Sequence, residues 1–240
     1  MKKIELDVHT HTSASGHAYS TITEMAKSAS EIGIKLLGIT DHANGMPGTC
    51  HDFYFANFEV IPRQMFGIEL MMGSEINIVD YEGGLSLSNR FIDGLDLRIA
   101  GIHPHCYQYG TIRQNTDAVL GAMKNPRIDI ISHPDDGRCP LHYEELVLAS
   151  KKYHTLLEVN NSSLGNPSRL NARENVLEFL RLCKHYEVPV IMDSDAHFAT
   201  EIATLDRSVS VLEEAEFPDE LVMNYNLEMF KDFIKRNRMN

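Results

Sequence analysis

The sequence has no basic surplus, no long apolar run and no closely paired cysteines. Its 240 residues carry 34 acidic and 22 basic side chains, which gives a formal net charge of −12, and its lysines and arginines nowhere form a block. Such a surface repels long nucleic acids unless bound cations reverse its sign locally. We therefore expect no nucleic-acid partner.

The chain also lacks the features of a membrane or secreted protein. No segment approaches the roughly 18 consecutive apolar residues of a membrane span. The N-terminal stretch MKKIELDVHT passes from two lysines directly into a predicted strand, without the apolar region and cleavage site of a secretory signal. We therefore expect no membrane partner and a cytoplasmic location, and we leave a homo-oligomer open.

Cysteine chemistry is poorly represented. Cys50, Cys106, Cys139 and Cys183 are widely spaced and form no C-x-x-C pair, so the sequence predicts no cysteine zinc site. In a reducing compartment these residues would be free thiols. The sequence also contains no convincing Ser-His-Asp or Cys-His arrangement, and we therefore expect no covalent intermediate on a side chain.

Short apolar, β-branched runs alternate with longer segments of helical period, which is typical of repeated βα units around a parallel sheet. The predicted strands are residues 4–8, 35–40, 69–79, 97–102, 128–132, 155–160 and 188–193. Amphipathic helices are predicted at 21–33, 115–125, 142–153 and 173–186, with one or two closing helices in 217–237. No linker divides the chain. We expect an α/β fold with one domain over residues 1–240, either a closed or nearly closed barrel or an open doubly wound sheet.

Histidines and carboxylates follow these strands at or near their carboxyl ends. The candidates are His9, His11, His17, His42, Glu75, His103, His133, Asp195 and His197. In parallel α/β folds the βα loops converge at that end, so these residues can meet in space. Burying so many titratable groups would be costly unless metal ions held them. Imidazole and carboxylate without thiolate suit zinc, manganese or iron.

Some positions stay open at this point. Asp193 and Asp195 have the same strand parity, so spacing alone does not choose between them. The remaining histidines fall in predicted loops or helices, where we expect structural or solvated side chains: His51, His142, His154 and His185. The role of His105 is left open.

Seven ordered motifs carry a resemblance that spans nearly the whole chain: DVHTHTSASGHAYST, GIKLLGITDH, GSEINI, IAGIH, IISHP, EVNNSS and SDAH. Together they resemble the polymerase and histidinol phosphatase (PHP) superfamily and, within it, the YcdX-type phosphatase branch. The resemblance implies a distorted seven-stranded TIM-like barrel with three metal ions at the C-terminal ends of its strands. Zinc is the first choice, with manganese and iron as alternatives.

The resemblance also assigns the ligands. It implies that one metal is bound by His9, His11, Glu75 and Asp195. It places a second on Glu75, His103 and His133, with Glu75 bridging the two, and a third on His17, His42 and His197. Every position that the family pattern requires is filled in this sequence.

A bridging carboxylate can hold two metals roughly 3.5–4 Å apart, which suits in-line displacement at phosphorus. A water held between them would be acidified towards neutral pH and is the predicted nucleophile. We therefore predict a phosphatase that hydrolyses small phosphomonoesters, with Glu75, Asp195 and His197 as catalytic residues. Further candidates for supporting or substrate contacts are Asp41, Asn160 and Asn161, and, for clamping phosphate, Arg138, Arg169 and Arg173.

Four alternatives remain. An amidohydrolase also opens with His-x-His, but its bridging lysine has no counterpart at a strand end here. A nuclease or phosphodiesterase acting on polynucleotide ends would need a basic groove with stacking aromatics. Histidinol phosphate is an alternative substrate. A non-catalytic metal-binding accessory module is the alternative outside enzymes, and lost ligands would have favoured it.

Overall fold

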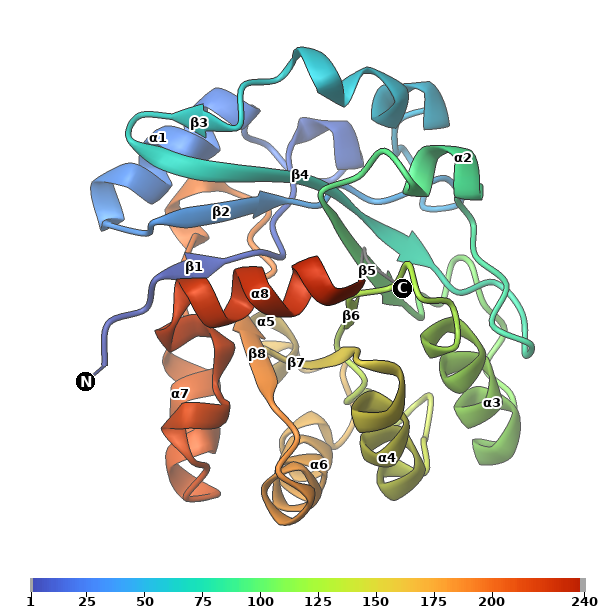
Figure 1. The fold of residues 1–240 in the computed structure, drawn as a ribbon. Helices are drawn as coiled ribbons and strands as arrows, with labels where there is room; N and C mark the ends of the chain where they lie inside the picture. Colours follow the sequence, from blue (N-terminus) through green and yellow to red (C-terminus); the bar gives the residue numbers. More distant parts are fainter. Residues whose placement is uncertain (1, 238–240) are drawn as a thin grey trace.

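A computed structural model describes residues 2–237 of the chain and contains a nearly closed barrel of parallel strands (Figure 1). Seven strands follow one another around it: β1 (Leu6–Asp7), β2 (Leu36–Ile39), β4 (Ile68–Asn77), β5 (Leu97–Gly101), β6 (Ile130–Ile131), β7 (Leu156–Asn160) and β8 (Val190–Asp193). A parallel bridge between Thr10 and Ala196 brings the chain beyond β1 against the chain beyond β8. The predicted barrel is confirmed, and the open doubly wound sheet is wrong.

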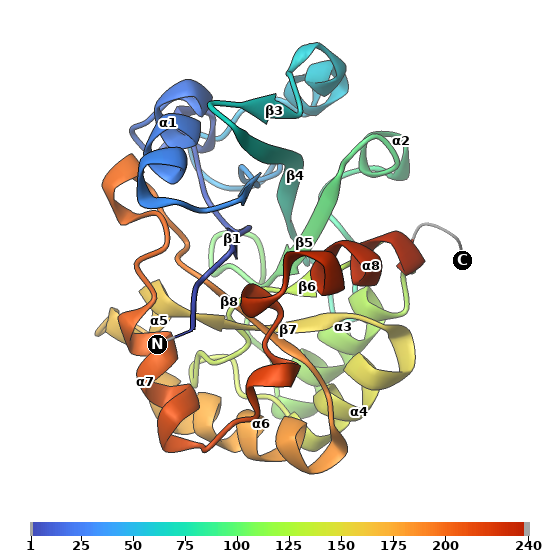
Figure 2. The ribbon, with the colours of Figure 1, turned by 60° about the vertical axis from the view of Figure 1, so that its left-hand side comes forward.

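Helices cover the outside of the barrel. They are α1 (Ile22–Ile32), α3 (Ile112–Met123), α4 (Tyr143–Tyr153), α6 (Ala172–Tyr186) and α7 (Asp206–Glu214). Figure 2 shows α1 beside β3 and β4, on the opposite side of the molecule from α6. The first four helices were predicted, whereas α7 was not.

Local sequence explains where helices begin and end. The Thr21 hydroxyl accepts the Glu24 N–H, and the Glu24 carboxylate accepts the Thr21 N–H, so two otherwise unpaired donors at the start of α1 are satisfied. Thr111 and Gln114 do the same for α3, which therefore begins three residues earlier than predicted. Gly33 ends α1 with a φ of 89°, a conformation that costs glycine little.

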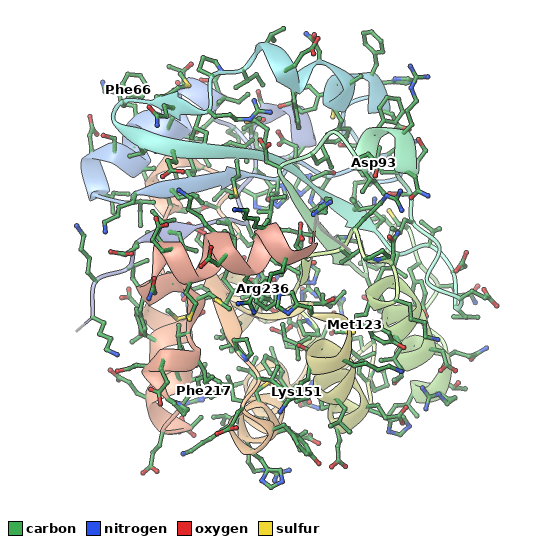
Figure 3. The ribbon with its side chains drawn as sticks, viewed as in Figure 1. Phe66, Asp93, Met123, Lys151, Phe217 and Arg236 are labelled. Atoms are coloured by element: carbon green, nitrogen blue, oxygen red, sulfur yellow. The ribbon has the colours of Figure 1, made fainter. Side chains whose placement is uncertain are left out.

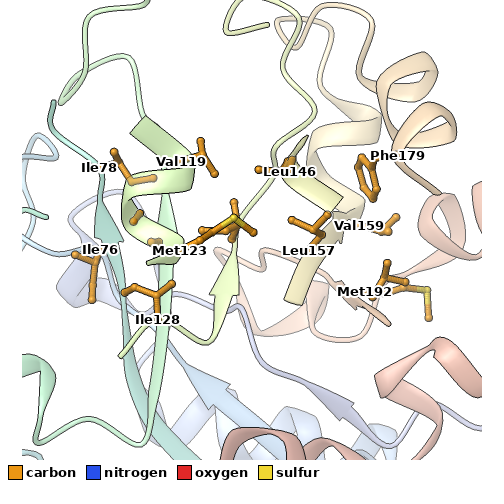
Figure 4. Close-up of a cluster of buried hydrophobic side chains, with 14 of the residues drawn as sticks. Ile76, Ile78, Val119, Met123, Ile128, Leu146, Leu157, Val159, Phe179 and Met192 are labelled. Carbon is orange, nitrogen blue, oxygen red and sulfur yellow. The ribbon is translucent and has the colours of Figure 1, made fainter. Parts of the chain in front are cut away.

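An outer hydrophobic core lies between the helices and the barrel (Figure 4). Val119 and Met123 of α3, Leu146 of α4 and Phe179 of α6 are fully or almost fully buried there against the strands. Burial of each such side chain stabilises the fold by about 1.5–3 kcal/mol. This packing fixes the strands whose ends carry the polar residues.

The amino-terminal end of the barrel is closed by α8 (Leu227–Asn237), which crosses in front of the strands in Figure 1. Phe230, Phe233 and Ile234 of this helix form a second buried cluster with the first residues of the strands, such as Leu36 and Leu97. Charged side chains are exposed on this side of the molecule, among them Lys151 of α4 and Arg236 of α8 (Figure 3). The opposite, carboxyl-terminal end is left for the polar residues.

Smaller elements complete the structure. They are β3 (Gln64–Met65), which pairs antiparallel with β4, the short helices α2 (Asn89–Ile92) and α5 (Asn161–Gly165), and five 3-10 segments at Ser13–Ser15, Asp52–Val60, Ala199–Glu201, Asp219–Leu221 and Met223–Tyr225. Within residues 2–237, no helix has both the length and the apolar character needed to cross a bilayer.

Candidate metal centre

The structure brings all nine predicted ligands together at the carboxyl end of the barrel. Their contacts form one connected set, and three groups within it have ligand atoms within 4.8 Å of one another: His9, His11 and Asp195; His11, His42 and His197; and His42, Glu75 and His103. His17 joins the set through His197, and His133 joins it through Glu75. Residues up to 188 positions apart in the chain thus form one cluster.

Glu75, on β4 and fully buried, lies at the centre of this cluster. Its Oε2 atom faces three imidazoles: His42 Nδ1 at 2.9 Å, His9 Nε2 at 3.2 Å and His11 Nε2 at 3.6 Å. Its Oε1 atom faces two others, His133 Nε2 at 2.9 Å and His103 Nε2 at 3.2 Å, and accepts the Ser132 hydroxyl at 2.7 Å. The two oxygens of one carboxylate therefore serve two separate sets of histidines.

Asp195 and His197 lie on the solvent side of the cluster. Asp195 Oδ1 is 3.2 Å from His11 Nε2 and 3.7 Å from His9 Nε2. The side chains of Asp195 and His197 are 15% and 27% exposed, whereas those of His9 and His11 are fully buried. Solvent therefore reaches the cluster from the side of Asp195 and His197. Asp193 Oδ1 instead accepts the Val8 N–H at 2.7 Å, so Asp195 is the aspartate that faces the histidines.

In five of the histidines, Nδ1 lies within hydrogen-bonding distance of an acceptor oxygen. The pairs are His9 with Glu158 Oε1 (2.7 Å), His11 with Ser15 Oγ (3.1 Å), His17 with the Ser15 carbonyl (3.1 Å), His103 with Asn77 Oδ1 (2.8 Å) and His197 with the Asp195 carbonyl (2.9 Å). The Ser15 hydroxyl itself donates to Asp41, so it can only accept from His11. A proton held on Nδ1 leaves the Nε2 lone pair of a neutral imidazole free to bind a metal.

Four buried atoms of the cluster have no hydrogen-bond partner among the described residues: His9 Nε2, His11 Nε2, His42 Nδ1 and Glu75 Oε2. Buried polar atoms are costly when they are left unpaired. All four belong to side chains around the same Glu75 oxygen, and nitrogen and oxygen donors without thiolate suit zinc, manganese or iron. The residues present therefore fit a divalent metal.

The electrostatics of the cluster favour neutral imidazoles beside ionised carboxylates. Burial, together with the neighbouring His42 and His197, holds the pKa of His11 well below its usual value. Burial also lowers the pKa of His17 and of His103. Burial acts to raise the pKa of Glu75, but the surrounding histidines outweigh it and lower this pKa well below its usual value. Metal ligands need these protonation states.

His9 is the exception. Burial disfavours its imidazolium form, but the carboxylates of Glu158, Glu75 and Asp195 raise its pKa well above the usual value. A metal ion would therefore have to displace a proton from His9.

Two residues of the cluster have backbone conformations that are unusual for residues other than glycine. The φ angle is 28° at His133 and 55° at Asp195. Such positions persist only where the surrounding structure enforces them, and they gather at functional sites. His133 follows β6 and Asp195 follows β8. At these two positions the unusual backbone turns the His133 side chain towards Glu75 and the Asp195 side chain towards His11.

Sequence reasoning missed several supporting residues. Glu158 and Asn77 lie in strands, fully buried, and hold His9 and His103. The signal available for Glu158 was an acidic residue inside the apolar strand TLLEVN, two positions before Asn160 and therefore on the same face. Ser15 gave no such signal because its role depends on its contact with Asp41.

The other candidates for supporting contacts are now placed. Asp41 accepts the backbone N–H and the hydroxyl of Thr12 and the phenol of Tyr54, and so orders the loop after β1. Asn160 caps α5 through the Ser163 N–H, and its amide nitrogen lies 3.3 Å from Asp195 Oδ2. Asn161 accepts the backbone N–H groups of Arg207 and Ser208 instead.

The three candidate arginines differ in their partners and surroundings. Arg173 pairs with Glu214, and Arg138 hydrogen-bonds Asp136. Arg169 lines a small cavity beside His133, and its side chain is only 14% exposed. Its Nη1 atom forms an ion pair with Asp136 Oδ2 at 3.6 Å, but no residue within 2–237 hydrogen-bonds its guanidinium. His105 is exposed, as are His51, His142 and His185.

Comparison with known proteins agrees with this geometry. Residues 7–202 match the profile of the PHP domain. A probable phosphatase of Clostridium novyi is 42% identical over 97% of this chain and 95% of its own length. A probable phosphatase of Acetivibrio thermocellus is also 42% identical, over 98% of this chain and 97% of its own length. These relatives confirm the predicted enzyme class, a phosphatase.

A solved structure shares the fold. The histidinol phosphate phosphatase of Lactococcus lactis, in complex with zinc, L-histidinol and phosphate, superposes with a TM-score of 0.61 at 16% identity, over 90% of this chain and 95% of that one. The sequence relatives and the matched profile together identify the family. The chain belongs to the PHP domain family.

Proposed function

We propose that this PHP phosphatase hydrolyses small phosphomonoesters at a centre of three divalent metal ions. The observation that carries the proposal is the division of Glu75, whose Oε2 faces His9, His11 and His42 while Oε1 faces His103 and His133. A carboxylate in this arrangement suits a bridge between two metals. Bound divalent ions supply positive charge for a phosphate and lower the pKa of water.

The chain's own residues then have distinct tasks in this proposal. His9, His11, Glu75 and Asp195 hold the first metal, Glu75, His103 and His133 the second, and His17, His42 and His197 the third. Most of these ligands are neutral imidazoles, so the centre keeps most of the positive charge of its metals. That charge attracts a phosphate dianion locally, despite the acidic surface of the protein.

Arg169 is the proposed partner of the substrate phosphate on the His133 side. A guanidinium that is largely buried and has no hydrogen bond in residues 2–237 is free to donate to phosphate oxygens. Asp195 and His197 lie on the solvent side, where a substrate enters. With Glu75, they are the residues that we expect to affect catalysis most.

The proposal is tested with a substrate panel and metal-free protein reloaded with zinc, manganese or iron in turn. The panel contains p-nitrophenyl phosphate, glycerol phosphate, a nucleoside monophosphate and L-histidinol phosphate, which is included because the structural neighbour holds L-histidinol and phosphate. A phosphodiester, a single-stranded oligonucleotide and a cyclic imide represent the alternatives. We expect phosphomonoesters to turn over fastest. Faster cleavage of the oligonucleotide or of the imide would contradict the proposal.

A further inference from the structure

Strand β7 supplies none of the proposed ligands, yet one of its side chains lies directly behind them. Glu158 is fully buried, and its Oε1 atom accepts a hydrogen bond from His9 Nδ1 at 2.7 Å. Its Oε2 atom accepts the backbone N–H of His133 at 2.6 Å and a hydrogen bond from Asn160 Nδ2 at 3.1 Å. The same Asn160 nitrogen lies 3.3 Å from Asp195 Oδ2.

We infer that Glu158 is a positioning residue that fixes His9 and His133 together and so presets the two metal sites on either side of Glu75. The inference rests on the proposed metal centre but not on the substrate. It assigns Glu158 no contact with metal or with substrate.

The two oxygens of Glu158 act on opposite sides of the centre. Oε1 holds the proton of His9 on Nδ1, so Nε2 of His9 is presented towards Glu75 Oε2, at 3.2 Å. Oε2 holds the backbone at His133, where φ is 28°, and this turn directs His133 Nε2 to Glu75 Oε1, at 2.9 Å. A metal-binding histidine is commonly held in this way by a carboxylate on its other nitrogen, but one carboxylate here serves both proposed sites.

Fold stability alone does not explain Glu158. Within residues 2–237, its carboxylate forms no ion pair with a lysine or arginine, and His9 is its only ion-pair partner. Its hydrogen-bond donors, His9 Nδ1, the His133 N–H and Asn160 Nδ2, all belong to the centre or to its margin. Neutralising Glu158 should therefore disturb the metal centre more than the rest of the fold.

Glutamine at position 158 distinguishes a role in the metal centre from a role in fold stability. An amide has one acceptor oxygen and one donor nitrogen, whereas His9 Nδ1–H and His133 N–H require two acceptors. Glu158→Gln must therefore release one of them, with almost no change in side-chain volume. Glu158→Asp keeps both oxygens but withdraws them by one methylene. Glu178→Gln makes the same chemical change at an exposed position on α6 and is the matched control.

The test measures zinc affinity by competition with a chromophoric chelator, and thermal unfolding of the metal-free proteins. We expect Glu158→Gln to weaken zinc binding by about 10- to 100-fold, Glu158→Asp to weaken it less, and Glu178→Gln to leave it unchanged. The thermal unfolding midpoint of metal-free Glu158→Gln should lie only slightly below that of the wild type, because one buried donor loses its acceptor while the hydrophobic core is unchanged. Unchanged zinc affinity would overturn the inference. So would a metal-free Glu158→Gln protein that is already unfolded at the temperature of the binding assay, since unfolding alone would then explain the loss of zinc.

The outcome is independent of the substrate. If the wild type binds zinc but hydrolyses no phosphomonoester, the proposed function fails, while the loss of zinc affinity in Glu158→Gln still supports the positioning role. If the wild type binds none of zinc, manganese and iron, both are contradicted.

Discussion

The Nε2 atoms of His17 and His197 lie 3.1 Å apart, although 180 residues separate these histidines in the chain. Each ring has its Nδ1 against a backbone carbonyl, which only accepts, so each Nδ1 carries the proton. The two Nε2 lone pairs therefore face each other. Nitrogen ligands about 2.0–2.1 Å from a tetrahedral zinc are roughly 3.3 Å apart. The contact thus supports the proposed third metal site.

The first prediction concerns the number of metals. Wild-type protein loaded with zinc should contain about three ions per chain, and His17→Ala should contain about two, because His17 belongs only to the third proposed site. Elemental analysis after gel filtration measures both. His105→Ala removes an exposed histidine of another loop and should keep all three ions. A wild-type content of one ion would contradict the trinuclear centre.

Arg169 is predicted to bind the phosphate of the substrate. Arg169→Met keeps most of the apolar stem but removes the five N–H donors, so KM for phosphomonoesters should rise by roughly tenfold or more. Arg173→Met is the control, since Arg173 is already paired with Glu214. Steady-state kinetics with zinc-saturated protein give both values. Equal KM values for the two variants would remove Arg169 from the site.

The cysteines should be unreactive in the native protein. Burial raises the pKa of Cys50 to about 11 and that of Cys139 to about 12, and in both cases a nearby aspartate adds to the effect. A raised pKa means less thiolate at pH 8 than in an unperturbed thiol, so alkylation should be slow and should accelerate as the pH rises towards these values. Iodoacetamide labelling followed by mass spectrometry checks this. Rapid labelling of Cys50 or Cys139 at pH 8 would be inconsistent with the structure.

Chelation should abolish activity reversibly. The proposed chemistry needs bound metal, and the folded chain provides the ligands without rearrangement of the barrel, so added manganese or zinc should restore phosphomonoester hydrolysis. The assay compares phosphate release before chelation, after chelation and after reloading, with circular dichroism to verify the fold. Full activity in metal-free protein would count against a metal-dependent mechanism.

Much of the fold was predictable from the sequence because the hydrophobic period changes clearly between strands and helices. Six of the seven barrel strands lie within their predicted segments, and β4 begins one residue earlier, at Ile68. The antiparallel strand β3 and helix α7 were missed. Two residues, Gln64 and Met65, are too few to show a period, and α7 lies in the stretch between the last predicted strand and the closing helices, where no helix was assigned.

The clustering of the proposed ligands was predictable for a different reason: these residues occupy the carboxyl ends of parallel strands, and the fold brings those ends together. The residues that hydrogen-bond these histidines were not predictable. Glu158 reaches His9 from 149 residues away, and Asn77 reaches His103 from 26 residues away, and both contacts depend on strand register rather than on residue type. Spacing left Asp193 and Asp195 open and the family resemblance chose Asp195, but no spacing rule predicts the turn at φ 55° that directs Asp195 to the histidines.

The measurement that tests the account most directly is phosphomonoester hydrolysis by Glu75→Gln, combined with its metal content. The substitution keeps shape and volume but removes the charge and one anionic oxygen, so metal should be lost from the two bridged sites while the third keeps some occupancy. We predict a fall in rate of at least about a hundredfold. His185→Ala, an exposed residue of α6, should leave rate and metal content nearly unchanged. Full activity with a full metal complement in Glu75→Gln would contradict the bridging role and the mechanism built on it.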